Sequence, residues 1–187
     1  MVTHAERSEA TRSALLDAGR RLFAERGYAA VSVNDIAEAA GVTTGALYHQ
    51  FAGKRDLFGA VYSDLVKGVW ALVLEARASH AQPSLLADCE AYLDSCANPA
   101  FNRITIDGPT VLGSDQVLDE AQAMVEASLT EARDRGEIVT TPTILARMLA
   151  AALKEAAMTI ATADDPAAAR DAARESARQL IAGLSAQ

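Results

Sequence analysis

Apolar side chains recur at intervals of three and four residues along most of this chain, and this spacing is what most restricts the fold. Within residues 9–26, for example, Leu15, Leu22 and Phe23 would share one face of a helix. No window shows the sustained alternation of a β-strand, and residues 104–106 are too few to form one. Half of the residues are hydrophobic but only 5% are aromatic, which favours closely packed helices over sheet. The sequence therefore predicts an all-α fold.

Capping residues and glycines divide this pattern into about nine helices. Residues 101–113, which contain Asp107-Gly108-Pro109, are expected to form short helical pieces and turns. Polar residues stand at the expected helix starts, namely Ser32, Thr43, Ser114, Thr141 and Asp165. The remaining helices are expected over residues 9–26, 33–40, 44–50, 54–79, 83–96, 114–135, 142–162 and 166–183.

Charge is distributed unevenly between the two ends of the chain. The net charge of −8 by itself argues against a nucleic-acid partner. Residues 1–55, however, hold seven Lys and Arg against six Asp and Glu, a balance of +1, so residues 56–187 carry −9. The acidic balance therefore does not exclude DNA binding by the N-terminal part.

The sequence has no obvious membrane or export signal. No stretch approaches about 20 unbroken apolar residues, and the polar N-terminus lacks the apolar region of a signal peptide. A cytoplasmic protein with no membrane partner is expected.

Cys89 and Cys96 are too far apart along one helix for a bridge within it. Two buried thiols are the simpler interpretation, and a redox sensor is the alternative.

The most informative stretch is residues 32–51, SVNDIAEAAGVTTGALYHQF. It predicts a short capped helix, a tight turn at Gly41 and a second short capped helix. Ile36 and Ala37 can pack on Val42 and Leu47, which would fix the crossing of the two helices. This is the layout of a helix-turn-helix, whose second helix enters the major groove of DNA.

The outward face of the second helix carries small and polar side chains that suit a DNA duplex. Thr44, Gly45 and Ala46 would let the backbone approach the bases; Thr44 offers a hydroxyl, and Ala46 a methyl for contact with thymine. Tyr48 offers its hydroxyl to a phosphate, and His49 can reach a base or a phosphate. Taken alone, His49 could equally be an ordinary surface residue.

Two flanking residues are further candidates for phosphate contacts. Ser32 and Lys54 stand at the starts of neighbouring helices, where backbone N–H groups attract anions. Taken alone, Lys54 would be read as a solvated surface charge. The combination with the helix-turn-helix favours DNA contact for both.

Residues 15–58 resemble the DNA-binding domain of the TetR family of repressors, through the pieces LLDAGRRLFAERGY, VSVNDIAEAAGVTTGALYHQF and GKRDLF. With the helix order, the resemblance implies a helix-turn-helix domain over residues 1–53 and a ligand-binding and dimerisation domain over residues 54–187. The sequence departs at Gly53, where a polar cap is usual, and at Ala52, where a basic residue is common. The resemblance implies base or phosphate contacts for Thr43, Thr44, Gly45, Tyr48, His49 and Lys54.

The resemblance also places a small-molecule pocket among the middle helices. Two polar residues, Arg103 and Thr105, with Asp107, could orient a ligand, although residues 107–109 could be a plain turn. Core packing is the simpler interpretation for each apolar candidate. The apolar candidates for the pocket wall are Tyr62, Trp70, Tyr92, Phe101, Met124, Met148 and Met158.

The last two helices are expected to form a dimer interface. The helix over residues 142–162 is hydrophobic nearly all round and must be buried on more than one side. The final helix offers a partner stripe through Ala173, Ala177, Leu180 and Leu184. The resemblance implies a four-helix interface made of these two helices from each subunit.

These observations predict a homodimeric transcriptional repressor that binds a palindromic double-stranded DNA operator and is released by a small-molecule effector. No catalytic motif is present, and His4, His49 and His80 lack zinc-ligand spacing, so we expect no enzyme, metal or cofactor. The acidic charge favours one alternative, a helical ligand- or partner-binding protein without sequence-specific DNA binding. A helical enzyme with an unfamiliar motif is a third, and activation in place of repression also stays open.

Overall fold

The structure, a computed structural model, describes residues 3–79, 84–96, 98–138 and 141–184. Nine helices make up nearly all of this described part, so the predicted all-α fold is confirmed. Their bounds are α1 His4–Arg26, α2 Val33–Ala39, α3 Thr44–Gln50, α4 Lys54–Ser79, α5 Leu85–Ser95, α6 Pro99–Leu112, α7 Ser114–Asp134, α8 Pro142–Thr162 and α9 Pro166–Leu184.

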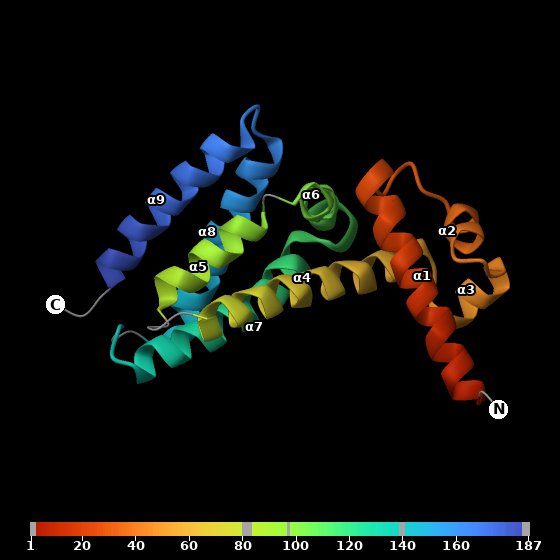
Figure 1. The fold of residues 1–187 in the computed structure, drawn as a ribbon, viewed down its shortest axis with the longest axis horizontal. Helices are drawn as coiled ribbons and strands as arrows, with labels where there is room; N and C mark the ends of the chain where they lie inside the picture. The colour runs from red at the N-terminus through yellow and green to blue at the C-terminus, as the bar shows by residue number, and fades with distance from the viewer. Residues whose placement is uncertain (1–2, 80–83, 97, 139–140, 185–187) are drawn as a thin grey trace.

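The helices form two groups that α4 connects (Figure 1). At one end, α1, α2 and α3 pack on each other. At the other end, α5, α7, α8 and α9 pack together, and α4 runs from one group into the other. Helix α6 lies between the groups and contacts both α1 and α8. This arrangement gives α4 and α6 contact with both ends of the molecule.

Two clusters of buried side chains hold these groups together. The first is centred on the rings of Phe23, Tyr28 and Phe58, whose centroids lie 5.1–5.8 Å apart. It extends through Tyr62 of α4 and Ile104 of α6. The second cluster joins α4, α5, α7, α8 and α9. Because the first cluster includes residues of α1, α3, α4 and α6, the group of α1, α2 and α3 is packed directly on the rest of the chain.

Most helix boundaries follow local capping. Ser32 and Thr43 cap α2 and α3 as expected, and Asp165 Oδ1 accepts from the N–H groups of Ala167 and Ala168 at the start of α9. Helix α1 begins earlier than expected because Thr3 forms a capping box with Glu6. Ser84 caps α5, and Pro83, the expected start of that helix, lies outside the described residues.

Two expected helix caps differ from the structure, one in its position and the other in its hydrogen bonding. Ser114 is the first residue of α7 rather than its cap, because Gly113, with a φ of 103°, occupies the N-cap position. Thr141 does occupy the N-cap position of α8, but its side chain makes no capping hydrogen bond. At both starts, the helix begins without a side-chain acceptor for its first N–H groups.

The expectation of short helical pieces and turns over residues 101–113 is also wrong. The chain forms one helix, α6, that continues through Pro109. Proline inside a helix removes one backbone hydrogen bond. The far end of α6 is held by Arg55, whose Nε and Nη2 donate to the carbonyl oxygens of Val111 and Leu112 at 2.9 and 3.1 Å. A distant cation thus satisfies carbonyls that the sequence pattern left open.

Helix α4 is the one described helix long and apolar enough, by length and composition, to cross a membrane, with a mean hydropathy of 1.5. Asp64 and Lys67 interrupt its apolar run, which is why the sequence shows no unbroken span. In the fold, α4 packs against α1, α5, α6 and α7 and contributes to both buried clusters. These contacts are those of a core helix.

Candidate nucleic-acid interface and ligand cavity

The turn between α2 and α3 has the geometry that the sequence predicts. Gly41 takes a φ of +67°, its N–H donates to the Glu38 carbonyl at 3.0 Å, and the N–H of Val42 donates to the Ala37 carbonyl at 2.9 Å. This pair of bonds is a Schellman motif, which requires a residue in the left-handed region and so favours glycine. The motif reverses the chain and directs it into α3.

Helix α3 is anchored through its inner face. Leu47 is fully buried, and Phe51, just after the helix, is nearly so. The Arg12 guanidinium lies 4.5 Å from the centroid of the Phe51 ring, and Gln50 Nε2 donates to Ser8 Oγ at 2.7 Å. Contacts with α1 on this side therefore fix which face of α3 points outward.

The outer face of α3 is exposed over the residues predicted to contact DNA. Tyr48 has 59% of its surface exposed, and Thr43, Gly45 and His49 are also exposed. Thr44 and Ala46 are half-buried. The Thr43 side chain accepts from the N–H of Ala46 at 3.1 Å, which leaves its hydroxyl proton available. These side chains are accessible to a duplex, and their contacts with DNA stay predictions.

The two flanking residues already have partners within the protein. The Ser32 hydroxyl donates to Asp35 Oδ2 at 2.7 Å and accepts from the Asp35 N–H at 3.1 Å. Lys54 Nζ donates to the carbonyls of Tyr28 and Val31 at 2.9 and 2.8 Å and lies 4.1 Å from the centroid of the Tyr28 ring. Because an ammonium has three donors, Lys54 keeps one for a phosphate. Its first role is to hold the loop between α1 and α2.

The start of α4 replaces the cap that Gly53 cannot supply. Asp56 Oδ2 accepts from the backbone N–H of Ala52 at 2.9 Å. A carboxylate in the first turn of a helix also interacts favourably with the helix dipole. The Asp56 carboxylate therefore stabilises a helix start that Gly53 leaves without a side-chain cap.

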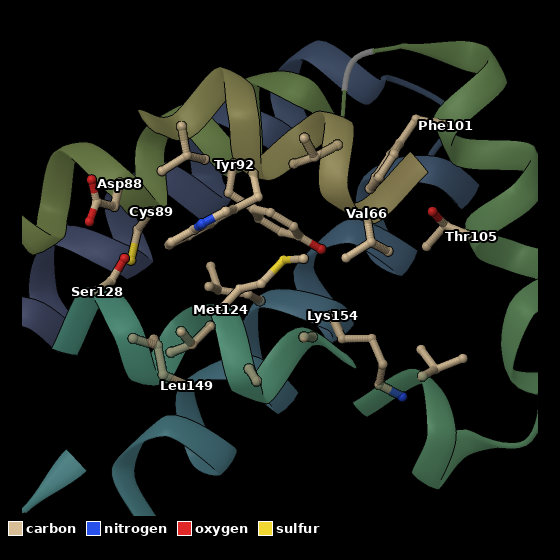
Figure 2. A pocket seen from close by; sticks show the side chains of 18 of the residues that line it. Val66, Asp88, Cys89, Tyr92, Phe101, Thr105, Met124, Ser128, Leu149 and Lys154 are labelled. Carbon is tan, nitrogen blue, oxygen red and sulfur yellow. The ribbon is translucent and has the colours of Figure 1, made fainter. Parts of the chain in front are cut away.

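A narrow, apolar cavity lies among α4, α5, α6, α7 and α8 (Figure 2). The empty space between its side chains is about 770 Å³ including its mouth, but the centre of a water molecule can occupy only about 70 Å³ of it. Six predicted residues line it: Tyr62, Trp70, Tyr92, Phe101, Thr105 and Met124.

Arg103, Met148 and Met158 are not among the residues that line this cavity. Met148 lies on the outer face of α8 with 64% of its surface exposed. Arg103 lies against the end of α1: its guanidinium occupies the place that a Cβ at Gly27 would need, 2.3 Å from Nη2. Helical spacing alone could not separate these positions from the cavity wall.

Asp107 also contacts the DNA-binding end. Its Oδ2 accepts from the backbone N–H of Tyr28 at 2.7 Å. One turn of α6 therefore presents Arg103 and Asp107 to the end of α1. The Tyr62 ring of α4 packs on Gly108 of α6, and Tyr62 also lines the cavity. Of the three polar residues expected to orient a ligand, Arg103 and Asp107 instead join α6 to the end of α1, and only Thr105 lines the cavity.

Two sets of polar residues at the cavity were not found by sequence reasoning. Asp88 and Ser128 line one end, where Arg77 donates to both, at 3.0 Å from Nε to Asp88 Oδ1 and at 2.9 Å to Ser128 Oγ. Arg77 also pairs with Glu131. Lys154 lines the cavity as well. The sequence signal available for both Lys154 and Arg77 was a cation that follows a mostly apolar stretch of its helix.

Both cysteines are buried, and neither is in a disulfide. Burial raises the pKa of the Cys89 and Cys96 thiols to about 12 each. Thiols with raised pKa values react slowly because the thiolate is the nucleophile. No cluster of three or more His, Cys, Asp or Glu suited to a metal occurs within the described residues.

Comparison with known families matches both parts of the chain. A family model described as "Bacterial regulatory proteins, tetR family" covers residues 15–61. A second, described as "Tetracyclin repressor-like, C-terminal domain", covers residues 83–184. The two models together include α3, most of the cavity wall and the last two helices.

Individual relatives point the same way. The HTH-type transcriptional regulator AcrR of Shigella flexneri is 38% identical over 73 residues, 39% of this chain and 34% of AcrR. The HTH-type transcriptional repressor KstR2 of Rhodococcus jostii is 40% identical over 68 residues, 36% of this chain and 33% of KstR2. The chain thus matches about a third of the length of these curated relatives. A TetR-family transcriptional regulator from Pectobacterium atrosepticum has a similar structure, with a TM-score of 0.84 and 29% identity over 99% of this chain and 98% of that one.

Proposed function

Since the chain belongs to the TetR family of transcriptional regulators, we propose that it is a homodimeric repressor that releases a palindromic operator when a small molecule enters the cavity. The observation that carries this proposal is the outer face of α3. Leu47 is sealed inside while Tyr48, with 59% of its surface exposed, and Gly45 face outward. A recognition helix needs this division between an anchored face and a free one.

The outer surfaces of α8 and α9 support the homodimer. Ile144 and Met148 of α8 are 77% and 64% exposed, and Leu180 of α9 is 56% exposed. Large apolar side chains grouped on neighbouring helices favour burial against a partner. In such a dimer the two copies of α3 would enter successive major grooves about 34–36 Å apart. A regulator of this kind works in the cytoplasm, beside the DNA.

Helix α6 supports a coupling between the cavity and α3. Thr105 of α6 lines the cavity, and Asp107, two residues on, holds the backbone of Tyr28 beside the loop before α2. A ligand can lower DNA affinity only by its differential binding to a state in which these contacts are rearranged. We propose that α6 shifts between two positions and α1 follows it.

The test is an electrophoretic mobility shift with fragments of the surrounding genome, including the chain's own promoter region. We expect the purified protein to prefer one site. Tyr48→Ala should weaken binding to this site about tenfold or more without changing the melting temperature, because Tyr48 is exposed. Leu72→Ala, an exposed position on α4, is the control that should leave binding unchanged.

A folded dimer that prefers no DNA site would contradict the repressor and favour the alternative of a ligand- or partner-binding helical protein. Lys54→Ala is a weaker test, because losing the two carbonyl contacts of Lys54 would also loosen the loop before α2. If the protein binds a site but transcription from that site rises with it, the proposed repression is replaced by activation.

A further inference from the structure

A cationic side chain without an anionic partner lines the apolar cavity. Lys154 of α8 is half-buried there. Throughout the part of the chain that the structure describes, its ammonium makes neither a hydrogen bond nor an ion pair. Long charged side chains normally keep their head group in water or pair it. The unpaired ammonium of Lys154 is therefore available to an anionic group of a ligand in the cavity.

The charged groups at the other end of the cavity are already neutralised. In Figure 2, Asp88 and Ser128 lie at one end of the cavity, and Lys154 and Thr105 lie toward the other. Both carboxylate oxygens of Asp88 accept from Arg77. The Asp88 end therefore offers a ligand no free charge, and among the described residues that line the cavity Lys154 is the charged side chain without a partner.

The other acidic residues near this region do not take the place of a partner. Glu120 of α7 is half-buried; burial raises its pKa, while a hydrogen bond from Gln116 and the charge of Lys67 lower it. Glu155, the neighbour of Lys154 in sequence, is exposed on the outer side of α8. Among the described residues, neither carboxylate forms an ion pair with Lys154.

Further hydrogen-bond donors line the same cavity. Among the described residues, the hydroxyls of Tyr62 and Thr105 and the indole N–H of Trp70 have no hydrogen-bond partner, and all three residues are part of the wall. An ammonium and an indole N–H can only donate hydrogen bonds, and a hydroxyl is able to donate one. The unused polar groups of the cavity are thus complementary to an acceptor.

We propose that the ligand of this cavity is an apolar molecule with one anionic group, such as a carboxylate, which pairs with Lys154. The proposal rests on the proposed function, because it names the chemical class of the effector. The apolar wall would take the body of the molecule, and its narrowness favours a slender or flat shape. A neutral ligand would bury the ammonium without a partner, which costs affinity.

Trp70 makes the proposal testable without DNA. It is the chain's single tryptophan and it lines the cavity, so its fluorescence reports occupancy directly. We would titrate the full-length protein with decanoate and with 1-decanol, and with 4-cyclohexylbutanoate and its alcohol. For at least one pair, the carboxylate should bind roughly tenfold or more tightly than the alcohol, as expected for a charge-assisted hydrogen bond.

Variants at position 154 identify the source of that preference. Lys154→Met keeps the apolar stem and should remove the preference for the carboxylate while leaving alcohol binding unchanged. Lys154→Arg keeps the charge and should retain the preference. Arg21→Met, at an exposed cation of α1 outside the cavity wall, is the control for the loss of a positive charge and should behave as the wild type. Alcohol binding by Lys154→Met also shows that the variant is folded.

Three results would overturn the proposal: no fluorescence response to either carboxylate, equal or tighter binding of both alcohols, or an unchanged preference in Lys154→Met. A mobility shift separates this failure from failure of the proposed function. If an operator is bound but the carboxylates are not, the ligand class is wrong and the repressor stands. If a carboxylate binds through Lys154 but no DNA fragment is preferred, the ligand class stands and the repressor is wrong.

Discussion

At position 45 the chain carries a residue that helices disfavour. Glycine in a helix costs about 0.5–1 kcal/mol relative to alanine. A Cβ at Gly45 would meet only Thr43 Oγ1, at an ordinary contact distance of 3.7 Å, so packing within the protein does not require glycine here. The missing side chain instead leaves room on the exposed face of α3.

We therefore predict that Gly45→Ala raises the free energy of unfolding by about 0.5–1 kcal/mol and weakens operator binding. Urea unfolding and a mobility shift would measure the two effects. Gly68→Ala is the control: Gly68 lies within α4 with nothing near its absent Cβ, so it should gain similar stability and keep its DNA affinity. Unchanged operator binding by Gly45→Ala would exclude close approach of DNA at this position.

The two thiols predict a loss of stability in alkali. Burial raises the pKa of Cys89 and Cys96 from 9.0 to about 12 in the folded protein. Below pH 9 both states are protonated, and the free energy of unfolding does not depend on these groups. Between pH 9 and 12 the unfolded state loses its protons first, so stability falls by up to about 1.4 kcal/mol per pH unit and thiol.

Urea unfolding at pH 8 and pH 10.5 would measure this loss, and the Cys89→Ala, Cys96→Ala double variant should show a shallower fall. At neutral pH, the folded wild type should react with a thiol reagent far more slowly than the urea-unfolded chain. Equal rates would revive the redox-sensor interpretation.

Individual side-chain partners are the part of the site that the sequence could not predict. The start of α4 placed Lys54 beside the recognition helix, but nothing local indicates that the carbonyls of Tyr28 and Val31 converge on its ammonium. The same holds for Arg77 and Asp88, which meet only when α4 and α5 pack. Such contacts depend on tertiary packing, whereas the exposed face of α3 followed from helical spacing and caps within a few residues.

Among the elements, those with local signals were predicted to within one or two residues. Helices α2 and α3 have their caps and turn glycine inside one short segment, and α4 begins and ends where expected. Helix α6 was not predicted, because Gly108-Pro109 is a strong turn signal and the contacts that override it come from elsewhere. Arg55 and the rings of the first buried cluster supply them.

The contact between α6 and α1 leads to a prediction for Asp107. Asp107→Ala leaves the Tyr28 N–H without its acceptor, which should lower the free energy of unfolding by about 1–3 kcal/mol. If α6 transmits the effector response, this variant should also need more ligand to release the operator. Asp115→Ala, at an exposed side chain in the first turn of α7, should cost less, about 0.3–1 kcal/mol, and should leave the ligand response unchanged. Denaturation curves and ligand titrations of a protein–DNA complex would measure these effects.

At the scale of the whole molecule, the exposed apolar side chains of α8 and α9 predict a homodimer. Ile144→Glu with Met148→Glu places two charges on the proposed interface and should convert a dimer into a monomer, as measured by light scattering during gel filtration. Leu72→Glu, exposed on α4, should leave the dimer intact. A dimer that survives the double substitution would move the interface away from α8.

The boundary expected between residues 53 and 54 stays a prediction at this scale. The first buried cluster crosses it, since Phe23 of α1 and Leu47 of α3 belong to the same cluster as Phe58, Tyr62 and Ile104. Residues 1–53 expressed alone would expose the apolar surface of that cluster. The resemblance and the helix order placed the boundary here, but the first buried cluster runs across it.

The packing of the Tyr62 ring on Gly108 means that one added carbon atom at position 108 could change the ligand response of the proposed regulator. A methyl group at position 108 would lie 2.7 Å from Tyr62 Cε2, so the ring must move, and Tyr62 forms part of the cavity wall. The substitution Gly108→Ala would thus displace part of the cavity wall even when no ligand is bound. If the proposed coupling between the cavity and α3 holds, a reporter gene repressed by this variant should respond to the inducer at a different concentration, although neither the ligand nor the operator has changed.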